Sequence, residues 1–586
     1  TVFLPLLSLE GLEGRLFAPV ALTISFALGS ALLLSLTVIP AFSASLLQAG
    51  HSDEPWLVRK IAGFYEPLLD YALRHPLKII SLAFGGLAIA CVAYSQIGQT
   101  FMPVMDEGTP IITIRKHPTI SVDIAAETDM RIQREIMQHV PEVKGMMARA
   151  GADELGIDPV GLNETDNLLT LAPQKEWRSQ SLPWLLSQIR NILDSIPGIS
   201  YSFTQPIDMR VQEMIIGARG DVVVKIFGDD ITELNRLTRD VSNALKKLPG
   251  ARDVFGLQND GMRYLTAKVD RLAAGRFGLN AGEIQDALRV WVDGHQVGLV
   301  LEGSIRTPLV VRGSETSRRS SVDFARLPMV SKDGKVVELS QLADVQAENG
   351  PLQVIREEGR RFATVLANVS GRDLVGFVDE AKKLVAQTVK TPNGYAYEWG
   401  GQFENQQRAS KRLALVVPIA LSIIFLLLYF TFNSALQATL VFCNVPFAVI
   451  GGILALKLSG EFLSVPASVG FIALIGIAVL NGVVLISYIN GLLAEGNRTI
   501  REAVVEGARR RLRPVILTAT IAAFGLIPFL FATGPGAEIQ KPLAIVVIGG
   551  LISATVLTLV LLPILYYYSA NWHLYMHRFM RRKSDA

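Results

Sequence analysis

Apolar positions along the chain gather in long blocks near its two ends, and a mixed polar stretch, 98–412, separates them. A helix that crosses a bilayer needs about 20 predominantly apolar residues. The blocks therefore predict full membrane spans and one partial span. The partial span covers 1–8, and the full spans cover 18–42, 77–97, 413–432, 436–457, 466–490, 514–532 and 543–568.

The polar stretch alternates two periodicities. Ile111–Arg115 has the character of a strand, whereas Val122–His139 places apolar residues at helical spacing with acids on its other face. Further strands are predicted at 168–171, 222–227, 265–269 and 362–369, and further helices at 182–196, 231–247, 281–291 and 374–388. Strand–helix–strand units with short turns predict split βαβ, or ferredoxin-like, subdomains in a large α+β domain. The stretch 275–355 has short strands and many turns, which indicates an insert in the second subdomain.

Two apolar segments repeat each other around prolines. The spacings are 14 and 21 residues in both copies, at Pro5, Pro19 and Pro40 and again at Pro528, Pro542 and Pro563. Internal duplication of membrane helices is typical of transporter halves, and chance spacing is the alternative. The chain begins inside an apolar run without Met, and the first copy is cut off at its start. We therefore expect the C-terminal part of a longer two-repeat membrane protein.

Basic residues orient the spans, because cytoplasmic loops carry an excess of Lys and Arg. The 491–513 loop and the tail after 570 are rich in arginine, whereas the 458–465 loop has no basic residue. The basic loops are therefore expected in the cytoplasm, together with the connector 51–76. The polar stretch then lies in the periplasm of a bacterium with two membranes.

The composition excludes several classes of protein. The chain is 50% hydrophobic and 19% charged, with a mean hydropathy of +0.35. Its net charge of +3 gives no indication of nucleic acid as a partner. Cys91 and Cys443 both fall in apolar helices, so no disulfide framework is indicated. The polar stretch contains no nucleophile motif, phosphate loop or Cys/His metal-finger spacing, which counts against an enzyme.

Acid-bearing turns are the main candidate chemistry of the polar stretch. One Gly-rich loop, 153–166, carries five acids including Glu164 and Asp166. Asp208 and Glu213 form a second group, and Asp260 lies in a third turn. Carboxylate oxygens suit hard or borderline divalent cations. The alternative for each loop is a solvated surface. Nearby methionines could be soft ligands, or they could fill the core.

The membrane spans contain no Asp, Glu, Lys or Arg near their middle. The polar candidates are Asn481, Asn444 and Thr518. Asn481 lies next to Gly482, where helices can pack closely, and its alternative role is a hydrogen bond between helices worth about 0.6–2 kcal/mol. If the protein moves protons, the carboxylate that carries them is expected in the part that precedes this chain.

Several motifs together resemble the resistance-nodulation-division (RND) superfamily of efflux pumps. They are Gly400–Glu404 before a span, Val445–Gly452, Gly470–Gly476 with Asn481-Gly482, Arg511–Thr518, and Gly549-Gly550 ahead of Pro563. Leu9–Pro19 and Phe101–Gly108 are similar to the heavy-metal efflux branch and unlike the multidrug branch.

The resemblance implies a pump of twelve spans built from two halves. This chain then divides into the end of span five and span six (1–50), a cytoplasmic connector (51–76), span seven (77–97), a first porter subdomain (98–220), a second porter subdomain in two parts (221–274 and 356–412), a docking insert (275–355), spans eight to twelve (413–570) and a cytoplasmic tail (571–586). The family works as a homotrimer in the inner membrane of Gram-negative bacteria. It joins a periplasmic adaptor protein and an outer-membrane channel and is driven by proton influx. It has no resident cofactor, because the metal ion and the proton are transported.

The resemblance also weighs the choice of metal. Silver and copper(I) relatives carry methionines in the porter cleft, and alignment places Glu164, Glu213 and the neighbourhood of Asp260 at those positions. Oxygen ligands argue against copper(I) and resemble the cobalt-zinc-cadmium type. Glu164 and Glu213 are the first metal-contact candidates, followed by Asp208, Asp166 and Asp260. Leu480-Asn481 stands where copper-type relatives carry a Glu used in proton relay.

Proton-driven efflux of a divalent cation (Zn, Co, Cd or Ni) is thus the expected function. A multidrug or lipid exporter of the same superfamily is the first alternative, but it would need an apolar, aromatic-rich cleft. An inactive membrane fragment or scaffold is the second, and a periplasm-facing enzyme is the third.

Overall fold

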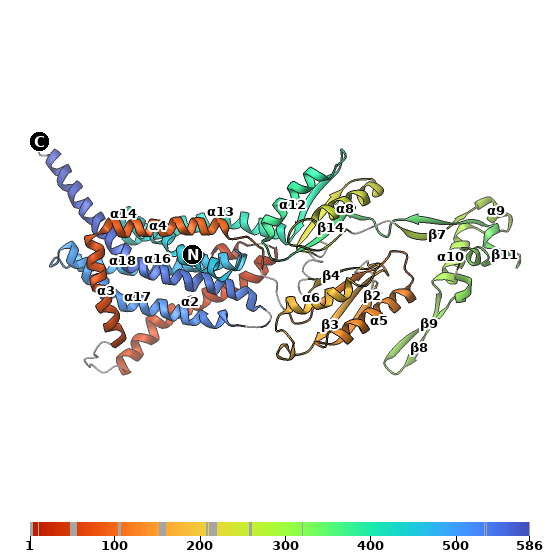
Figure 1. The fold of residues 1–586 in the computed structure, drawn as a ribbon, viewed down its shortest axis with the longest axis horizontal. Helices are drawn as coiled ribbons and strands as arrows, with labels where there is room; N and C mark the ends of the chain where they lie inside the picture. Colours follow the sequence, from red (N-terminus) through yellow and green to blue (C-terminus); the bar gives the residue numbers. More distant parts are fainter. Residues whose placement is uncertain are drawn as a thin grey trace.

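The computed structural model describes residues 4–9, 11–46, 56–102, 107–151, 160–206, 209, 220–256, 261–318, 320–532, 534 and 536–584. The molecule is elongated, with a helix bundle at one end and three α+β bodies beyond it (Figure 1). The first body contains β1–β4, α5 and α6. The second contains β5, β6, β13–β15, α8 and α12, and the distal body contains β7–β12 and α9–α11.

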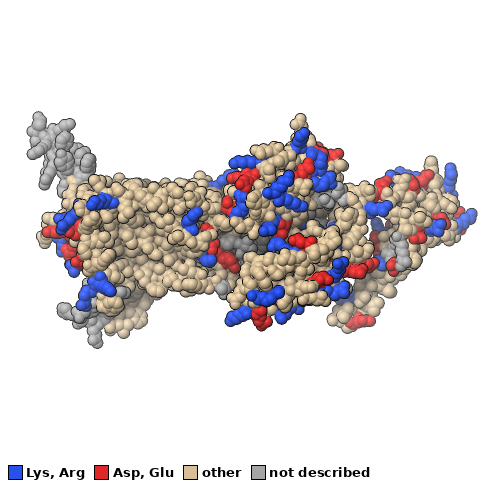
Figure 2. Space-filling model, in the orientation of Figure 1, with Lys and Arg blue, Asp and Glu red and all other residues tan. Residues whose placement is uncertain are grey.

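Within the described residues, seven long apolar helical segments form the bundle, as the hydrophobic pattern predicts. They are α2 (Gly11–Leu46), α4 (Pro76–Gln96), α13 (Gln402–Phe432), α14 (Ala435–Phe442) with α15 (Asn444–Ser459), α16 (Val465–Ala494), α17 (Ile500–Leu530) and α18 (Ala537–Ser584). The predicted partial span appears as the short helix α1 (Leu4–Leu7). Charged side chains are sparse over the bundle. They gather at the end of the bundle that is far from the α+β bodies, and on those bodies (Figure 2). This distribution fits a bilayer around the bundle.

The helices α15 and α18 are in backbone contact. A Cβ atom on Gly451 would collide with the carbonyl oxygen of Gly549, so only glycine fits there. Ser553 Oγ accepts from the Gly451 amide (3.0 Å) and donates to the Ala448 carbonyl oxygen (2.9 Å). Small residues that let helices approach and polar side chains that bond between them are the usual means of packing in membranes.

The connector helix α3 (Trp56–Arg74) lies across the end of the bundle that is far from the α+β bodies, at a steep angle to the spans (Figure 1). Tyr65 donates its hydroxyl to the Leu559 carbonyl oxygen of α18 (2.7 Å). Asp70 and Glu66 form ion pairs with Arg501 (2.8 Å) and Arg509 (2.7 Å) of α17. The connector is thus fixed to the end of the bundle that carries the basic loop.

The first body is a four-stranded antiparallel sheet in the order β2-β3-β1-β4. Its strands are β1 (Ile111–Arg115), β2 (Val143–Ala150), β3 (Glu164–Leu171) and β4 (Ser200–Thr204). The helices α5 (Val122–His139) and α6 (Leu182–Leu193) follow serine N-caps, because the hydroxyls of Ser121 and Ser181 accept from amides of the first turn. Ile112 and Ile114 pack with isoleucines and leucines of α5 and α6, so both helices cover one face of the sheet. A 3₁₀ turn at Gln174–Glu176 precedes α6.

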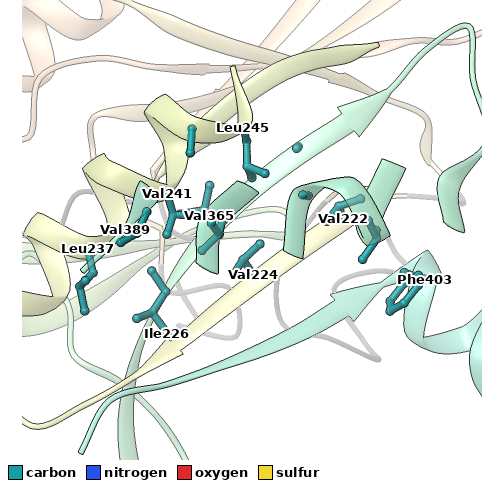
Figure 3. Packing of buried hydrophobic residues seen from close by; sticks show 14 of the residues in the cluster. Val222, Val224, Ile226, Leu237, Val241, Leu245, Val365, Val389 and Phe403 are labelled. Carbon is teal, nitrogen blue, oxygen red and sulfur yellow. The ribbon is translucent and has the colours of Figure 1, made fainter. Parts of the chain in front are cut away.

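The second body repeats this architecture with a five-stranded sheet, in the order β13-β14-β5-β15 and with β6 also paired to β14. Its strands are β5 (Val222–Phe227), β6 (Ala251–Gly256), β13 (Ile355–Glu357), β14 (Arg360–Val369) and β15 (Ala396–Gly401), and its helices are α8 (Ile231–Leu245) and α12 (Leu374–Thr388). Val222, Val224 and Ile226 meet the apolar faces of the helices (Figure 3).

The strand β15 runs directly into the membrane helix α13. Gly401, the N-cap of that helix, has φ 87°, and a Cβ there would collide with backbone of residues 220 and 221. The Gln402 amide donates to the Asp221 carbonyl oxygen (3.0 Å), and Phe403 is buried in the core of the second body (Figure 3). The first turn of α13 therefore belongs to the second body, while its later turns belong to the bundle.

The distal body extends from the second body on the paired strands β7 (Met262–Val269) and β12 (Ala343–Gly350) (Figure 1). It contains α9 (Arg271–Arg276), α10 (Ala281–Val292), α11 (Ser321–Ala325), the hairpin β8 (His295–Glu302) and β9 (Ile305–Val311), and the hairpin β10 (Pro328–Val330) and β11 (Val336–Glu338). Two 3₁₀ turns cover Glu315–Arg318 and Leu339–Gln341. Leu339 and Leu342 lie in its small apolar core.

Candidate metal-binding site

Two of the predicted metal ligands lie on one face of β3 in the first body. Glu164 pairs across the sheet with Arg115 of β1, and Asp166 pairs with Thr113. Successive side chains of a strand point to opposite faces, so Glu164 and Asp166 share the face that the helices leave uncovered. The residue between them, Thr165, points to the helix side, where its hydroxyl bonds Asp129 of α5 (2.7 Å). The acidic loop expected over 153–166 therefore ends earlier, because a strand begins at Glu164.

Glu164 is held by a two-pronged ion pair. Arg115 Nε lies 2.6 Å from Glu164 Oε2, and Arg115 Nη2 lies 2.8 Å from Oε1. Both side chains are 15% exposed, so the pair is shielded from bulk water. The Arg115 guanidinium also lies 4.2 Å from the ring centroid of Phe255 on β6. The first and second bodies thus meet at this arginine.

Asp166 is even less exposed and has its own partners. Its Oδ1 accepts from Thr113 Oγ1 (2.7 Å), and its Oδ2 accepts from Arg149 Nη2 of β2 (3.1 Å). Each of the two carboxylates is therefore bonded to an arginine of a neighbouring strand. Among the residues that the structure describes, no group of three or more His, Cys, Asp or Glu side chains is placed to hold a metal ion.

The other three predicted ligands, Asp208, Glu213 and Asp260, lie outside the described residues. The structure therefore places Glu164 and Asp166 together and leaves their relation to the other three as a prediction. Met209 is buried, as expected for a core residue, and its amide donates to the Gln205 carbonyl oxygen (2.7 Å).

A buried charge pair supports the strand that carries the carboxylates. Lys116 Nζ lies 2.8 Å from Asp129 Oδ1 and donates to Thr165 Oγ1 (2.7 Å). The side chains of Lys116 and Asp129 are 2% and 5% exposed. Sequence reasoning missed this network. The available signal was that Asp129 falls on the apolar stripe of α5, in helical register with Ala125, Ile132 and Ile136.

A second contact joins the first and second bodies. Arg190 of α6 forms an ion pair with Asp253 of β6 (3.0 Å), whose side chain is 4% exposed. Asn368 of β14 donates to the same carboxylate (3.1 Å). Two arginines of the first body, Arg115 and Arg190, therefore reach β6 of the second.

The polar residues predicted in the membrane differ in their contacts. Asn444 is buried and its Nδ2 donates to the Ala478 carbonyl oxygen (3.3 Å) and to Thr558 Oγ1 (2.5 Å), which joins α15 to α16 and α18. Asn481 is also buried, but no described residue accepts from its Nδ2. Thr518 Oγ1 donates to the Val515 carbonyl oxygen of its own helix (3.0 Å). Asn444 and Asn481 thus lie inside the bundle, as intramembrane polar groups usually do.

Sequence reasoning missed a further polar cluster, near the end of the bundle that carries the basic loop 491–513. Asn490 of α16 and Gln437 of α14 exchange hydrogen bonds of 2.9 and 3.3 Å between their side-chain amides. Tyr566 of α18 donates to Asn490 Oδ1 (2.6 Å). The signal would have been polar residues near the ends of three apolar segments, but only the fold brings them together.

The fold and these contacts define a multi-pass membrane protein with two split βαβ bodies outside the membrane, which meet beside a pair of carboxylates. The chain belongs to the AcrB/AcrD/AcrF family, whose model matches residues 1–570. It is similar to the cobalt-zinc-cadmium resistance protein CzcA of Cupriavidus metallidurans, with 40% identity over 96% of this chain and 54% of that protein. It is also similar to the cation efflux system protein CusA of Escherichia coli, with 30% identity over 99% of this chain and 56% of that protein.

The similarity extends to solved structures. A crystal structure of a heavy metal efflux pump superimposes with a TM-score of 0.84 at 35% identity, over 97% of this chain and 56% of that chain. The chain thus spans about half the length of the curated relatives it matches. The expected RND family and fold class are confirmed, and the chain is a multi-pass membrane protein related to pumps of the Gram-negative inner membrane.

Proposed function

We propose that this chain is the C-terminal part of an inner-membrane pump that exports divalent heavy-metal cations, Zn, Co, Cd or Ni, in exchange for protons. The observation that carries the proposal is the pair of carboxylates, Glu164 and Asp166, on one sheet face beside the second body. Higher identity to a cobalt-zinc-cadmium resistance protein (40%) than to CusA (30%) supports it.

The first and second bodies would be the two porter subdomains, and the distal body would be the docking insert. A cation would enter between the porter subdomains from the periplasm and bind Glu164 and Asp166. Glu213, Asp208 and Asp260 would supply further oxygen ligands. Oxygen coordination suits borderline divalent cations better than copper(I), and it exchanges more readily than a closed Cys/His site does.

Protonation in the membrane would drive the cleft between access and extrusion states. The polar groups near the middle of the spans are uncharged, and Asn481, Asn444 and Thr518 are among them. We therefore expect the proton-relay carboxylates in the half of the pump that this sequence does not cover. A homotrimer, a periplasmic adaptor protein and an outer-membrane channel complete the proposed system.

The test is the metal tolerance of a metal-sensitive Gram-negative host that carries the full-length gene, measured with Zn, Co, Cd, Ni, Cu and Ag. We expect the gene to restore growth in the presence of at least one of the first four metals. The Glu164→Ala variant should fail to restore it. The matched control is Glu348→Ala, because Glu348 also pairs with a basic side chain (Lys268, 3.0 Å) but lies on the stalk of the distal body. Growth restored only in the presence of Cu or Ag would refute the oxygen-ligand argument. Growth restored with none of the metals would favour a multidrug or lipid exporter.

A further inference from the structure

Both carboxylates proposed to hold the cation are engaged by arginine in this structure. Arg115 contacts both oxygens of Glu164, and Arg149 contacts one oxygen of Asp166. Charge-assisted bonds of this kind, above all the two-pronged arginine–carboxylate pair, are strong and directional. The guanidinium of Arg115 therefore takes the role at Glu164 that a bound cation would take.

A divalent cation and the Arg115 guanidinium would repel each other if both were bound to Glu164. The two positive groups would stand within a few ångströms of each other at a site where each side chain is only 15% exposed. Like charges repel more strongly where water is scarce. A cation that binds Glu164 must therefore displace Arg115 or bind against its repulsion.

The displacement of Arg115 would be felt beyond Glu164. The same guanidinium lies 4.2 Å from the Phe255 ring centroid, and Phe255 is buried on β6 beside Val223 and Leu366 of the second body. A cation over an aromatic face is attracted to it, and the attraction grows when the contact is desolvated. One side chain thus touches both the carboxylate and the neighbouring body.

We propose that Arg115 is a positioning residue that couples the occupancy of Glu164 to the contact between the first and second bodies. This inference rests on the proposed function, since it takes Glu164 as a ligand of the exported cation. In the empty state Arg115 neutralises Glu164 and holds Phe255. When a divalent cation binds, Arg115 leaves the carboxylate and releases the ring. One of the two arginine contacts that β6 makes with the first body is then lost, and β6 can shift about the Arg190–Asp253 ion pair that remains.

The same arrangement gives selectivity against the abundant monovalent cations. Na⁺ or K⁺ brings no more charge than the guanidinium does and would replace two directed hydrogen bonds of 2.6 and 2.8 Å. A divalent cation brings twice the charge to a pair of carboxylates two residues apart. The free energy needed to displace Arg115 from Glu164 is therefore offset by a divalent cation and not by a monovalent one.

The first test is Zn²⁺ binding to the purified full-length protein by titration calorimetry. Removing a competitor should strengthen binding, so Arg115→Gln should bind Zn²⁺ at least about fivefold more tightly, at the lower end of typical coupling between sites. Arg190→Gln is the matched control, because Arg190 also joins the first body to β6 but pairs with Asp253. It should leave the Zn²⁺ affinity unchanged. Arg115→Lys, which keeps the charge and loses the fork, should fall between wild type and Arg115→Gln.

The second test measures the coupling itself. Spin labels at Met147→Cys on β2 and Lys246→Cys after α8 report the distance between the two bodies, in a background without the native cysteines. Both positions are exposed. Zn²⁺ should shift this distance in the wild type. Phe255→Leu should lose most of the shift, since the ring contact is gone while the Arg115–Glu164 pair remains. It should also bind Zn²⁺ somewhat more tightly than the wild type, because coupling is reciprocal and the cation no longer has to break the ring contact.

The outcomes separate the inference from the proposed function. If Glu164→Gln binds Zn²⁺ as well as the wild type does, Glu164 is no ligand and the proposed site fails. If Glu164→Gln loses binding but Arg115→Gln binds no more tightly than the wild type, the site stands and the role of Arg115 is refuted. A shift that persists unchanged in Phe255→Leu also refutes the coupling.

Discussion

The buried pair beneath the candidate site gives the sharpest stability prediction. Asp129→Ala removes the partner of Lys116, whose side chain is 2% exposed and whose ammonium group lies 2.8 Å from the lost carboxylate. It also removes the acceptor of the Thr165 hydroxyl, which lies between Glu164 and Asp166 on β3. The substitution thus strands a charge in the core of the first body.

The magnitude follows from this burial. Removing one partner of a buried ion pair costs about 3–5 kcal/mol, because the remaining charge is left uncompensated. Replacing both partners by apolar residues of similar volume is often close to neutral. We therefore expect Asp129→Ala to be strongly destabilising, and Lys116→Met with Asp129→Leu to recover most of the loss.

Hydrogen exchange of the β1 and β3 amides in the purified protein measures this effect locally. Each 1.4 kcal/mol corresponds to a tenfold change, so Asp129→Ala should lower protection by a factor of about one hundred to a few thousand. The strand β5 in the second body is the internal control, because its protection should change little. Protection of β3 within tenfold of wild type, or a double variant as unprotected as the single one, would refute the reasoning.

Two further predictions concern other parts of the chain. The Arg178 guanidinium, hydrogen-bonded to Glu142 (2.7 Å), lowers the pKa of that carboxyl from 4.5 to about 2. A lowered folded-state pKa contributes stability that is present above pH 4.5 and lost as the pH falls toward 2. Glu142→Gln should therefore flatten this acid dependence in an unfolding titration followed by tryptophan fluorescence, and an unchanged profile would contradict the assignment. In the bundle, Asn444→Leu should lower the free energy of unfolding in detergent by about 0.6–2 kcal/mol, because it breaks hydrogen bonds between helices. Asn481→Leu should lower it by less. The reverse order would contradict the roles assigned to the two buried amides.

Uniform apolarity made the bundle predictable, since every long span is apolar over most of its length. The helices of the α+β bodies were equally accessible, and Val122–His139 matches α5 because its apolar stripe and serine cap agree. The strands were harder to predict. β3 begins with Glu-Thr-Asp-Asn, and it shows no alternation of apolar and polar residues there because Thr165 and Asn167 are polar yet buried toward the helices. Thr165 donates to Asp129 and Asn167 Oδ1 accepts from Gln133, and only the fold brings these partners of α5 to the strand.

The candidate site was predictable as a set of residue types and not as a set of contacts. The acids Glu164 and Asp166 stand out in sequence because oxygen donors cluster there. Their arginine partners do not, since Arg115 and Arg149 lie on different strands, and only the register of β1, β2 and β3 brings them opposite the acids. Cross-strand pairing is a long-range property, so a one-residue slip would have paired other side chains.

The junction between β15 and α13 has a mechanical consequence. The helix begins at the residue that follows the strand, its first turn is anchored in the sheet core through Phe403, and it then continues as one helix to Phe432. An α-helix rises about 1.5 Å per residue, and the first interruption of the hydrogen-bond ladder of α13 is expected at Pro418, well beyond the turn that is anchored in the sheet. Because strand and helix are joined without a loop, a tilt or axial displacement of the helix turns that precede Pro418 moves the sheet of the second body directly.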